Sequence, residues 1–149
     1  MGKIRELDEW FRLFKEYDDI FHELSRKMGL SDSAFIIFYG ICSLGNGCLQ
    51  KDICDSYYIR KQTVNSSIRS LEQDGYIYLE SGNGRDMHLY LTPKGQAFSE
   101  KNIRPVIQIE QDAFLEMEPS ERSAMVELTV KYVSLIKNKA KKLSFSAED

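Results

Sequence analysis

One short stretch of this 149-residue sequence combines side chains that can read a nucleic acid. Residues 60–71 include Arg60, Lys61 and Arg69 and no acid, although the whole chain has a formal net charge of −3. If the stretch is helical, residues spaced i, i+3, i+4 and i+7 share one face. One such face holds Gln62, Asn65, Ser66 and Arg69. Amides, hydroxyls and guanidinium groups are the donors and acceptors that pair with base edges in the major groove, so this face predicts contact with DNA.

The neighbouring residues extend this predicted interface. Val64, Ser67, Ile68 and Leu71 have the same helical spacing on the opposite face and predict a core contact. At the start of the helix, side chains can reach phosphates together with free backbone N–H groups, and an arginine in a Gly-rich loop can enter a narrow minor groove. The predicted DNA-binding set is Arg60, Lys61, Gln62, Thr63, Asn65, Ser66, Arg69 and Arg85.

The surrounding pattern predicts a helix-turn-helix followed by a β-hairpin wing. A short helix over 49–56 and a turn over 57–59 precede the helix over 60–74. Alternating strands over 76–80 and 87–91 follow, joined by a Gly- and Asn-rich tip. Further helices are expected over 3–28, 32–44, 93–117 and 120–142, with a break near Pro105. The expected fold class is mainly α with a small β-hairpin.

The first predicted helix carries an unusually aromatic stripe. Its apolar residues follow an a/d heptad pattern, namely Leu7, Trp10, Phe14, Tyr17, Phe21, Leu24 and Met28. A rod of 26 residues would be about 39 Å long, and it needs a large partner surface along this stripe. Packing inside one subunit and additional packing on a second subunit both remain open at this point.

These residues resemble the multiple-antibiotic-resistance regulator (MarR) family of winged-helix transcription factors. The order of the predicted helices resembles the family over about the whole chain. The resemblance is carried by Gln50-Lys51-Asp52-Ile53, Ile59, Lys61-Gln62-Thr63-Val64, Leu71-Glu72, Gly75-Tyr76-Ile77, Arg85 and Leu91-Thr92-Pro93-Lys94-Gly95.

The resemblance implies a homodimer whose dimerisation region is residues 1–30 and 96–143, with a winged helix-turn-helix at 31–95. It implies a pseudo-palindromic operator in double-stranded DNA, with half-sites roughly 34 Å apart. It also implies a repressor that a small aromatic or amphipathic ligand releases. Residues 144–149 are expected to be a disordered tail. A ligand pocket between the first helices could be lined by Tyr17, Phe21, Phe35, Phe38 and Tyr39, which are equally suited to ordinary core packing.

The sequence departs from the family pattern at several contact positions. The wing has Asn83-Gly84-Arg85 where the family usually has Asp-x-Arg. Ser66 and Ser70 stand where arginine or another contact residue is common, and Arg69 stands where an acid is common. Arg60 replaces the usual serine cap, and Tyr58 replaces the usual glycine of the turn.

Other functions fit the sequence less well than this interpretation. The sequence has no nucleophile elbow, phosphate loop or cofactor fingerprint, so neither an enzyme nor a bound cofactor is expected. Three cysteines, Cys42, Cys48 and Cys54, leave a thiol-redox-sensing regulator as an alternative, with Cys48 the most exposed candidate. His22 and His88 are too isolated to predict a metal site. A winged-helix module that binds only proteins is the other alternative.

No signal peptide or membrane span is predicted, so a cytoplasmic location is expected.

Overall fold

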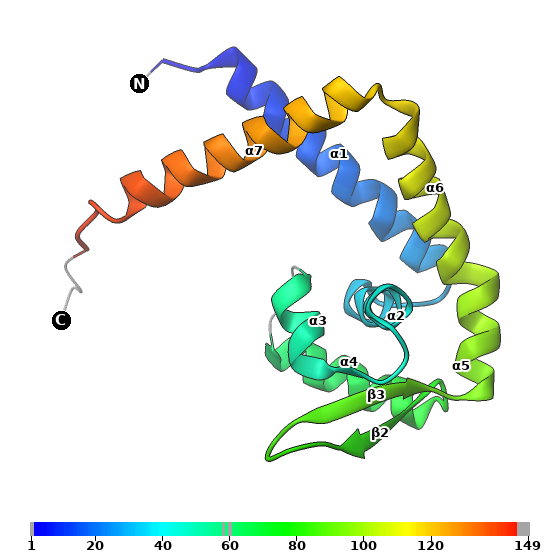
Figure 1. The fold of residues 1–149 in the computed structure, drawn as a ribbon. Coiled ribbons are helices and arrows are strands. Elements are labelled where there is room, and N and C mark those ends of the chain that lie inside the picture. Colours follow the sequence, from blue (N-terminus) through cyan, green and yellow to red (C-terminus); the bar gives the residue numbers. More distant parts are fainter. Residues whose placement is uncertain (1, 58, 60, 146–149) are drawn as a thin grey trace. The chain divides into compact units, whose positions relative to one another are not determined.

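The computed structural model describes residues 2–57, 59 and 61–145, and it divides the chain into two units, Met1–Ile107 and Gln108–Asp149. Most of the chain is helical (Figure 1), with one small sheet. The first unit contains a winged helix with a long helix before it. Its elements are α1 (Arg5–Lys27), α2 (Asp32–Leu44), β1 (Cys48–Leu49), α3 (Gln50–Ser56), α4 (Lys61–Gln73), β2 (Ile77–Ser81), β3 (Met87–Leu91), α5 (Pro93–Phe98), a π-helical turn η1 (Ser99–Ile103) and the start of α6 (Arg104–Glu116).

Helix α2 is the centre of the hydrophobic core. Six of its residues are buried, and α4, α3 and η1 pack around it. The predicted inward face of α4 is buried, since Val64, Ser67, Ile68 and Leu71 are each under 9% exposed. The predicted inward residue Ile53 of α3 is fully buried as well. Burial of an apolar side chain contributes about 1.5–3 kcal/mol, so this packing fixes the orientation of α4.

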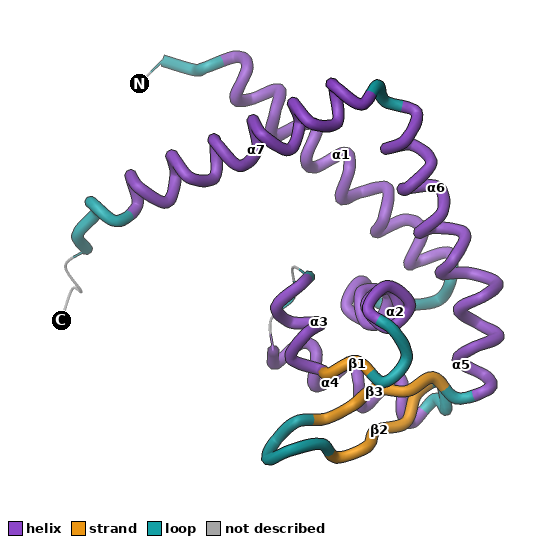
Figure 2. The backbone as a smooth tube through the Cα atoms, viewed as in Figure 1, coloured by secondary structure: helices purple, strands orange, loops and turns teal. Residues whose placement is uncertain are grey.

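The sheet has three antiparallel strands in the order β1-β3-β2, which Figure 2 shows in orange. The β2–β3 hairpin has the predicted alternation, with Ile77 opposite Leu91 and Leu79 opposite Leu89. The short strand β1 was not predicted, and its Leu49 pairs with His88 of β3. Two residues are too few to show a period, which is why the sequence pattern could not reveal this strand.

Several contacts hold the connection from the wing into α5. The Thr92 side chain accepts a hydrogen bond from the Gly95 backbone N–H, and Pro93 occupies the first turn. A Cβ at Gly95 would lie 1.9 Å from the carbonyl oxygen of Tyr76, so only glycine allows this approach. The Lys94 ammonium donates to the Asp74 carbonyl oxygen, 2.6 Å away. These contacts fix the wing to the end of α4.

The helix predicted over 93–117 is continuous but contains an irregular turn. Five residues, Ser99–Ile103, are π-helical and directly precede the segment that contains Pro105. A proline in a helix removes one backbone hydrogen bond, and a local π-helical turn is one way for the chain to accommodate that loss.

The junction between α1 and α2 is held by a polar cluster. Asp32, in the first turn of α2, accepts hydrogen bonds from Ser25 Oγ at 2.7 Å and from His22 Nδ1 at 2.9 Å. Ser25 Oγ also lies 2.9 Å from the His22 carbonyl oxygen, and Ser25 is buried. Burial opposes ionisation of Asp32, but the hydrogen bonds from Ser25 and His22 outweigh it and hold the pKa of Asp32 below its ordinary value.

Substitution of Ser25 by alanine is expected to destabilise the protein by about 1 kcal/mol, because it removes one buried hydrogen bond to a carboxylate. The lowered pKa of Asp32 means that this stabilisation is present above the ordinary carboxyl pKa and is lost as the pH falls through the folded-state value. Urea unfolding should therefore show a larger difference between Ser25→Ala and the wild type at pH 7 than at pH 3. Ser43→Ala, on the exposed side of α2, is the matched control, and equal effects of the two substitutions would contradict the assignment.

The second unit contains the end of α6 and helix α7 (Pro119–Ala140). Glu118 forms a capping box with Glu121, and Pro119 begins the helix, close to the predicted start at residue 120. The Arg122 guanidinium donates to the carbonyl oxygens of Leu115 and Met117 at 3.1 and 3.2 Å. Among the described residues, no helix combines the length and the apolar character that a membrane span requires.

Candidate nucleic-acid interface

Helix α4 presents the predicted polar face to solvent. Gln62, Thr63, Asn65, Ser66 and Arg69 are all exposed, whereas the opposite face is buried against α2. Ser67 Oγ donates to Ser33 Oγ at 2.8 Å and so fastens α4 to α2 with a hydrogen bond as well as with apolar contacts. The sequence-based separation of the two faces is therefore confirmed. An exposed, acid-free face with amides, hydroxyls and one guanidinium can pair with base edges and phosphates.

Two of the predicted contact residues are the cations Arg60 and Lys61. Arg60 lies outside the described residues, as does Tyr58 in the predicted turn. Lys61 is the first residue of α4, and its side chain is not described. The prediction that these two cations contact DNA therefore remains a prediction.

The wing presents Arg85 at the tip of the β2–β3 hairpin. Arg85 is exposed and follows Gly84, whose φ of +62° lies in the left-handed region that a glycine tolerates. The next residue, Asp86, pairs with Lys51 of α3, with Lys51 Nζ 3.4 Å from Asp86 Oδ1. This pair ties the hairpin tip to the helix-turn-helix and limits where Arg85 can lie. The sequence analysis gave no role to Lys51 or Asp86, since an ion pair between residues 35 positions apart leaves no local pattern.

A second contact missed by the sequence analysis lies within the helix-turn-helix. The Gln50 side-chain amide of α3 donates a hydrogen bond to Asn65 Oδ1 of α4. Ser66 Oγ donates to the Thr63 carbonyl oxygen at 3.0 Å, within its own helix. The fragment Gln50-Lys51-Asp52-Ile53 is part of the family resemblance, but the resemblance implied no contact for Gln50. Gln50 is the first residue of α3.

Two side chains near the wing have structural partners. His88 Nδ1 lies 2.8 Å from the Gly47 carbonyl oxygen, and the His88 side chain is half-buried. Asn46 Oδ1 accepts a hydrogen bond from the Leu91 backbone N–H at 2.7 Å. Both contacts attach the loop before β1 to strand β3, so His88 stabilises the wing.

The three cysteines, Cys42, Cys48 and Cys54, are half-buried. Burial, together with the nearby Asp52 carboxylate, raises the pKa of Cys48 to about 11, and burial also raises the pKa of Cys42. Reactive cysteines have lowered pKa values, because the thiolate is the nucleophile. The environment of Cys48 thus counts against the redox-sensing alternative. Among the described residues, no group of three or more metal-binding side chains comes together.

The aromatic residues proposed for a ligand pocket form a chain of ring contacts. Tyr17 contacts Phe21 at 4.9 Å between centroids, Phe21 contacts Phe35 at 6.3 Å, and Phe35 contacts Tyr39 at 6.0 Å. Phe38 is fully buried and instead contacts the rings of Tyr76 and Phe98. Phe35 and Phe38 thus have core positions, and a pocket that uses the exposed Tyr17 end of the chain remains a prediction.

Comparison with known proteins identifies the winged-helix part of the chain. Residues 28–86 match the MarR_2 model, described as MarR family. This segment spans α2, α3, α4, β2 and the tip of the hairpin. No curated protein sequence matches the chain.

Solved structures share the fold over nearly the whole chain. A MarR family regulator from Neisseria meningitidis superposes with a TM-score of 0.72 at 20% identity, covering 94% of this chain and 96% of that one. A MarR family regulator from Listeria monocytogenes, solved with a 26mer DNA, has a TM-score of 0.68 at 22% identity, covering 99% and 100%. The Bordetella bronchiseptica protein BpsR, whose DNA binding is regulated by 6-hydroxynicotinic acid, has a TM-score of 0.61 at 22% identity, covering 84% and 98%.

These comparisons agree with the element order of helix-turn-helix and hairpin wing that the sequence predicted. Residues 28–86 are thus similar to the MarR family of winged-helix transcriptional regulators, and the chain shares its fold with solved structures of that family.

Proposed function

We propose that the protein is a homodimeric, sequence-specific DNA-binding regulator of the cytoplasm that acts by binding rather than by catalysis. In this proposal it represses transcription at a pseudo-palindromic operator and is released by a small aromatic or amphipathic ligand. The observation that carries the proposal is the exposed face of α4 formed by Gln62, Asn65, Ser66 and Arg69. The tethered wing with Arg85 adds a second cationic contact on the same unit. A similar fold bound to a 26mer DNA supports a duplex as the partner.

The exposed apolar surface supports a dimer. The C-terminal half of the α1 stripe, with Phe21, Leu24 and Met28, packs against the core, whereas Phe14 and Tyr17 are 56% and 54% exposed. Helix α7 has no buried residue although its stripe includes Leu128, which is 64% exposed. Exposed apolar patches of this kind mark interaction surfaces.

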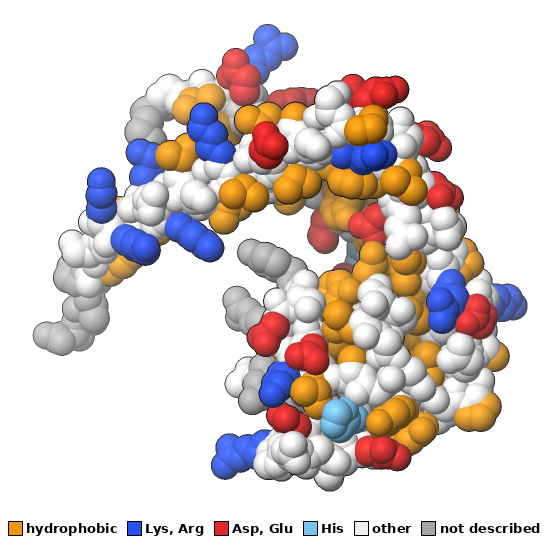
Figure 3. All heavy atoms as spheres, in the orientation of Figure 1, with side chains coloured by type: hydrophobic (Ala, Val, Ile, Leu, Met, Phe, Trp, Pro, Cys, Tyr) orange, Lys and Arg blue, Asp and Glu red, His pale blue; other side chains and the backbone are white. Residues whose placement is uncertain are grey.

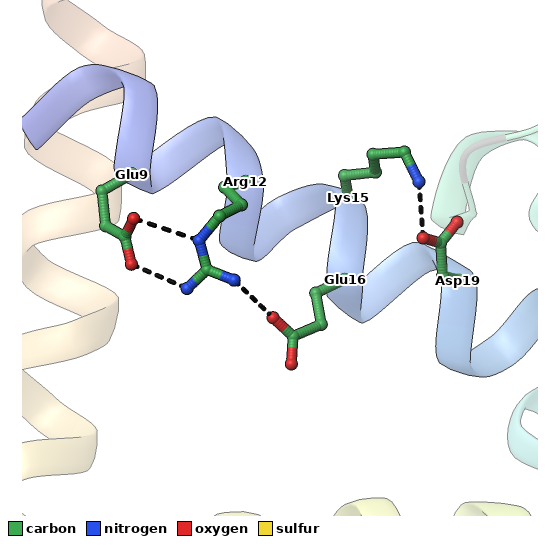
Figure 4. Close-up of polar contacts among 5 residues, drawn as sticks. All are labelled: Glu9, Arg12, Lys15, Glu16 and Asp19. Carbon is green, nitrogen blue, oxygen red and sulfur yellow. Dashed lines mark hydrogen bonds and ion pairs between the residues drawn. The ribbon is translucent and has the colours of Figure 1, made fainter. Parts of the chain in front are cut away.

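The other face of α1 is polar, and several of its charged side chains pair with one another. Figure 4 shows that Arg12 binds both Glu9 and Glu16, while Lys15 binds Asp19. Solvent screens these exposed intrahelical pairs, so they contribute little to stability. Because this face satisfies its own charges, we propose that the aromatic stripe is the face of α1 that binds the second subunit. Figure 3 shows one face of the molecule, with hydrophobic side chains in orange, Lys and Arg in blue, and Asp and Glu in red.

The ligand-release part of the proposal rests on two observations. Tyr17 and Phe21 continue the buried aromatic chain toward exposed surface, so a flat apolar ligand could stack there. In addition, 6-hydroxynicotinic acid regulates DNA binding by BpsR, a protein of similar fold.

Selection from fragmented genomic DNA, followed by footprinting, tests the proposal. We expect two protected half-sites related by a two-fold axis and separated by about one helical turn. Adding aromatic acids to the bound complex should then release the operator. A footprint without two-fold symmetry would contradict the dimer, and binding that no aromatic acid weakens would contradict the release mechanism.

A further inference from the structure

The tip of the wing extends beyond the part of the hairpin that the sheet supports. Strand β1 pairs with His88 and Leu89 of β3, and the pairing of β2 with β3 ends with Ser81 opposite Met87. Arg85, the predicted DNA contact, lies past this last pair. Loop tips move on the nanosecond to microsecond timescale unless other contacts hold them. The contacts that the tip makes therefore decide where Arg85 can lie.

The tip itself is a tight turn. The Asp86 backbone N–H donates to the Asn83 carbonyl oxygen at 3.1 Å, and the Gly82 N–H donates to the Asp86 carbonyl oxygen at 2.8 Å. Gly84 has a positive φ and Arg85 does not, which is the pattern of a type II′ turn. These hydrogen bonds use backbone atoms only, so the turn does not depend on the side chains of Arg85 and Asp86.

An ion pair joins this turn to the helix-turn-helix. Lys51 Nζ of α3 lies 3.4 Å from Asp86 Oδ1. Helix α3 begins directly after β1, so the sheet also fixes where Lys51 starts. Among the described residues, neither Arg85 nor Asp86 has another ion-pair partner. Because Asp86 adjoins Arg85 in the turn, a contact that holds Asp86 also limits the positions that Arg85 can reach.

We propose that Lys51 and Asp86 are positioning residues for DNA binding, and that their ion pair holds the tip of the wing where Arg85 meets the duplex. The inference rests on the proposed function, because it assigns how one contact of that interface is prepared. Holding a side chain in place before binding lowers the entropy cost of forming the complex. An acid at the tip of the wing thereby supports DNA binding, although its charge alone would oppose it.

A double-mutant cycle on operator affinity separates this role from simple charge effects. The Coulomb energies of separate charges with DNA add, so they cancel in the cycle and leave only the coupling between the two residues. Asp86→Asn should be about fivefold less favourable to binding in the wild type than in Lys51→Gln, because only the wild type has an ion pair to lose, at roughly twofold for each wing of a dimer. Fluorescence anisotropy measures the affinities, with operator DNA that the wild type selects from genomic fragments.

A second acid of the same hairpin provides the matched control cycle. Glu80 is an exposed residue of β2, and it has no ion-pair partner within the part of the chain that the structure describes. Glu80→Gln removes the same charge as Asp86→Asn, so it should combine additively with Lys51→Gln, within about twofold. Circular dichroism confirms that each variant is folded.

Arg85→Ala tests whether the ion pair acts through the arginine. In this background the coupling between Lys51 and Asp86 should fall below about twofold, since no guanidinium is left to position. A direct phosphate contact by Lys51 instead predicts additive effects and a logarithmic salt slope that is shallower by about 0.9 for each lysine. Additive effects, or coupling that persists in Arg85→Ala, would overturn the assignment while leaving the DNA-binding function in place. Absence of any DNA binding by the wild type would overturn the function, and the assignment with it.

Discussion

Replacement of Phe14 by glutamate is expected to dissociate the proposed dimer and to abolish tight DNA binding. Phe14 lies on the exposed half of the α1 stripe, 5.0 Å from Trp10 between ring centroids. An uncompensated charge buried in an interface costs about 3–5 kcal/mol. The dimer dissociation constant should therefore rise at least about 100-fold. Analytical ultracentrifugation over a concentration series measures this change.

The control for this prediction changes charge without touching the stripe. Lys15→Gln lowers the net charge by one, as Phe14→Glu does, but it removes only the exposed Lys15–Asp19 pair. Such an exposed pair contributes little to stability, so the control should stay dimeric. Because Phe14 is not part of the buried core, both variants should remain folded by circular dichroism. A Phe14→Glu variant that sediments as the wild type does would show that this face is not the interface.

The combined substitution of Arg69 and Arg85 by alanine is expected to weaken operator binding about 1,000-fold. Each arginine that binds a base or phosphate contributes about 1–3 kcal/mol, and the substitution removes four such arginines from a dimer. The dependence of affinity on salt should also become shallower, by about 0.9 in the logarithmic slope for each phosphate that is no longer neutralised. Fluorescence anisotropy at several salt concentrations measures both quantities.

A matched pair elsewhere in the chain controls for the loss of positive charge. Lys101→Ala with Arg104→Ala removes the same two charges per subunit from η1 and the start of α6, away from α4 and the hairpin. This control should shift the affinity by less than about tenfold, because only the overall field of the protein changes. Equal reductions in affinity for the two double variants would show that net charge governs binding rather than the side chains of α4 and the wing.

The sequence predicted most of the fold because each element had a strong local signal. The buried and exposed faces of α4 followed from residues spaced three and four apart. Alternation around a Gly-rich tip predicted strands over 76–80 and 87–91, and the structure has them at Ile77–Ser81 and Met87–Leu91. These signals depend on neighbouring residues only, so a single sequence contains them.

The contacts that a single sequence could not show join residues far apart in the chain. The Gln50–Asn65 bond, the Lys51–Asp86 ion pair and the bond between His88 and Gly47 all depend on how elements pack. The partner of His88 comes from a loop 41 residues away in sequence, so alternation along the strand could not reveal it. The candidate site was thus predictable in its residue types and its face, and unpredictable in the contacts that orient individual side chains.

Binding of the wild-type protein to self-selected genomic DNA, measured by anisotropy across a salt series, tests the central claim most directly. Sequence-specific operator recognition predicts a dissociation constant in the range of about 10⁻⁸–10⁻¹¹ M and at least about 1,000-fold weaker binding to unrelated DNA. It also predicts an affinity that falls steeply as salt rises, because phosphate contacts release counterions. Binding that is absent or insensitive to salt, in a protein that remains dimeric, would contradict the account and favour a winged-helix module that binds proteins.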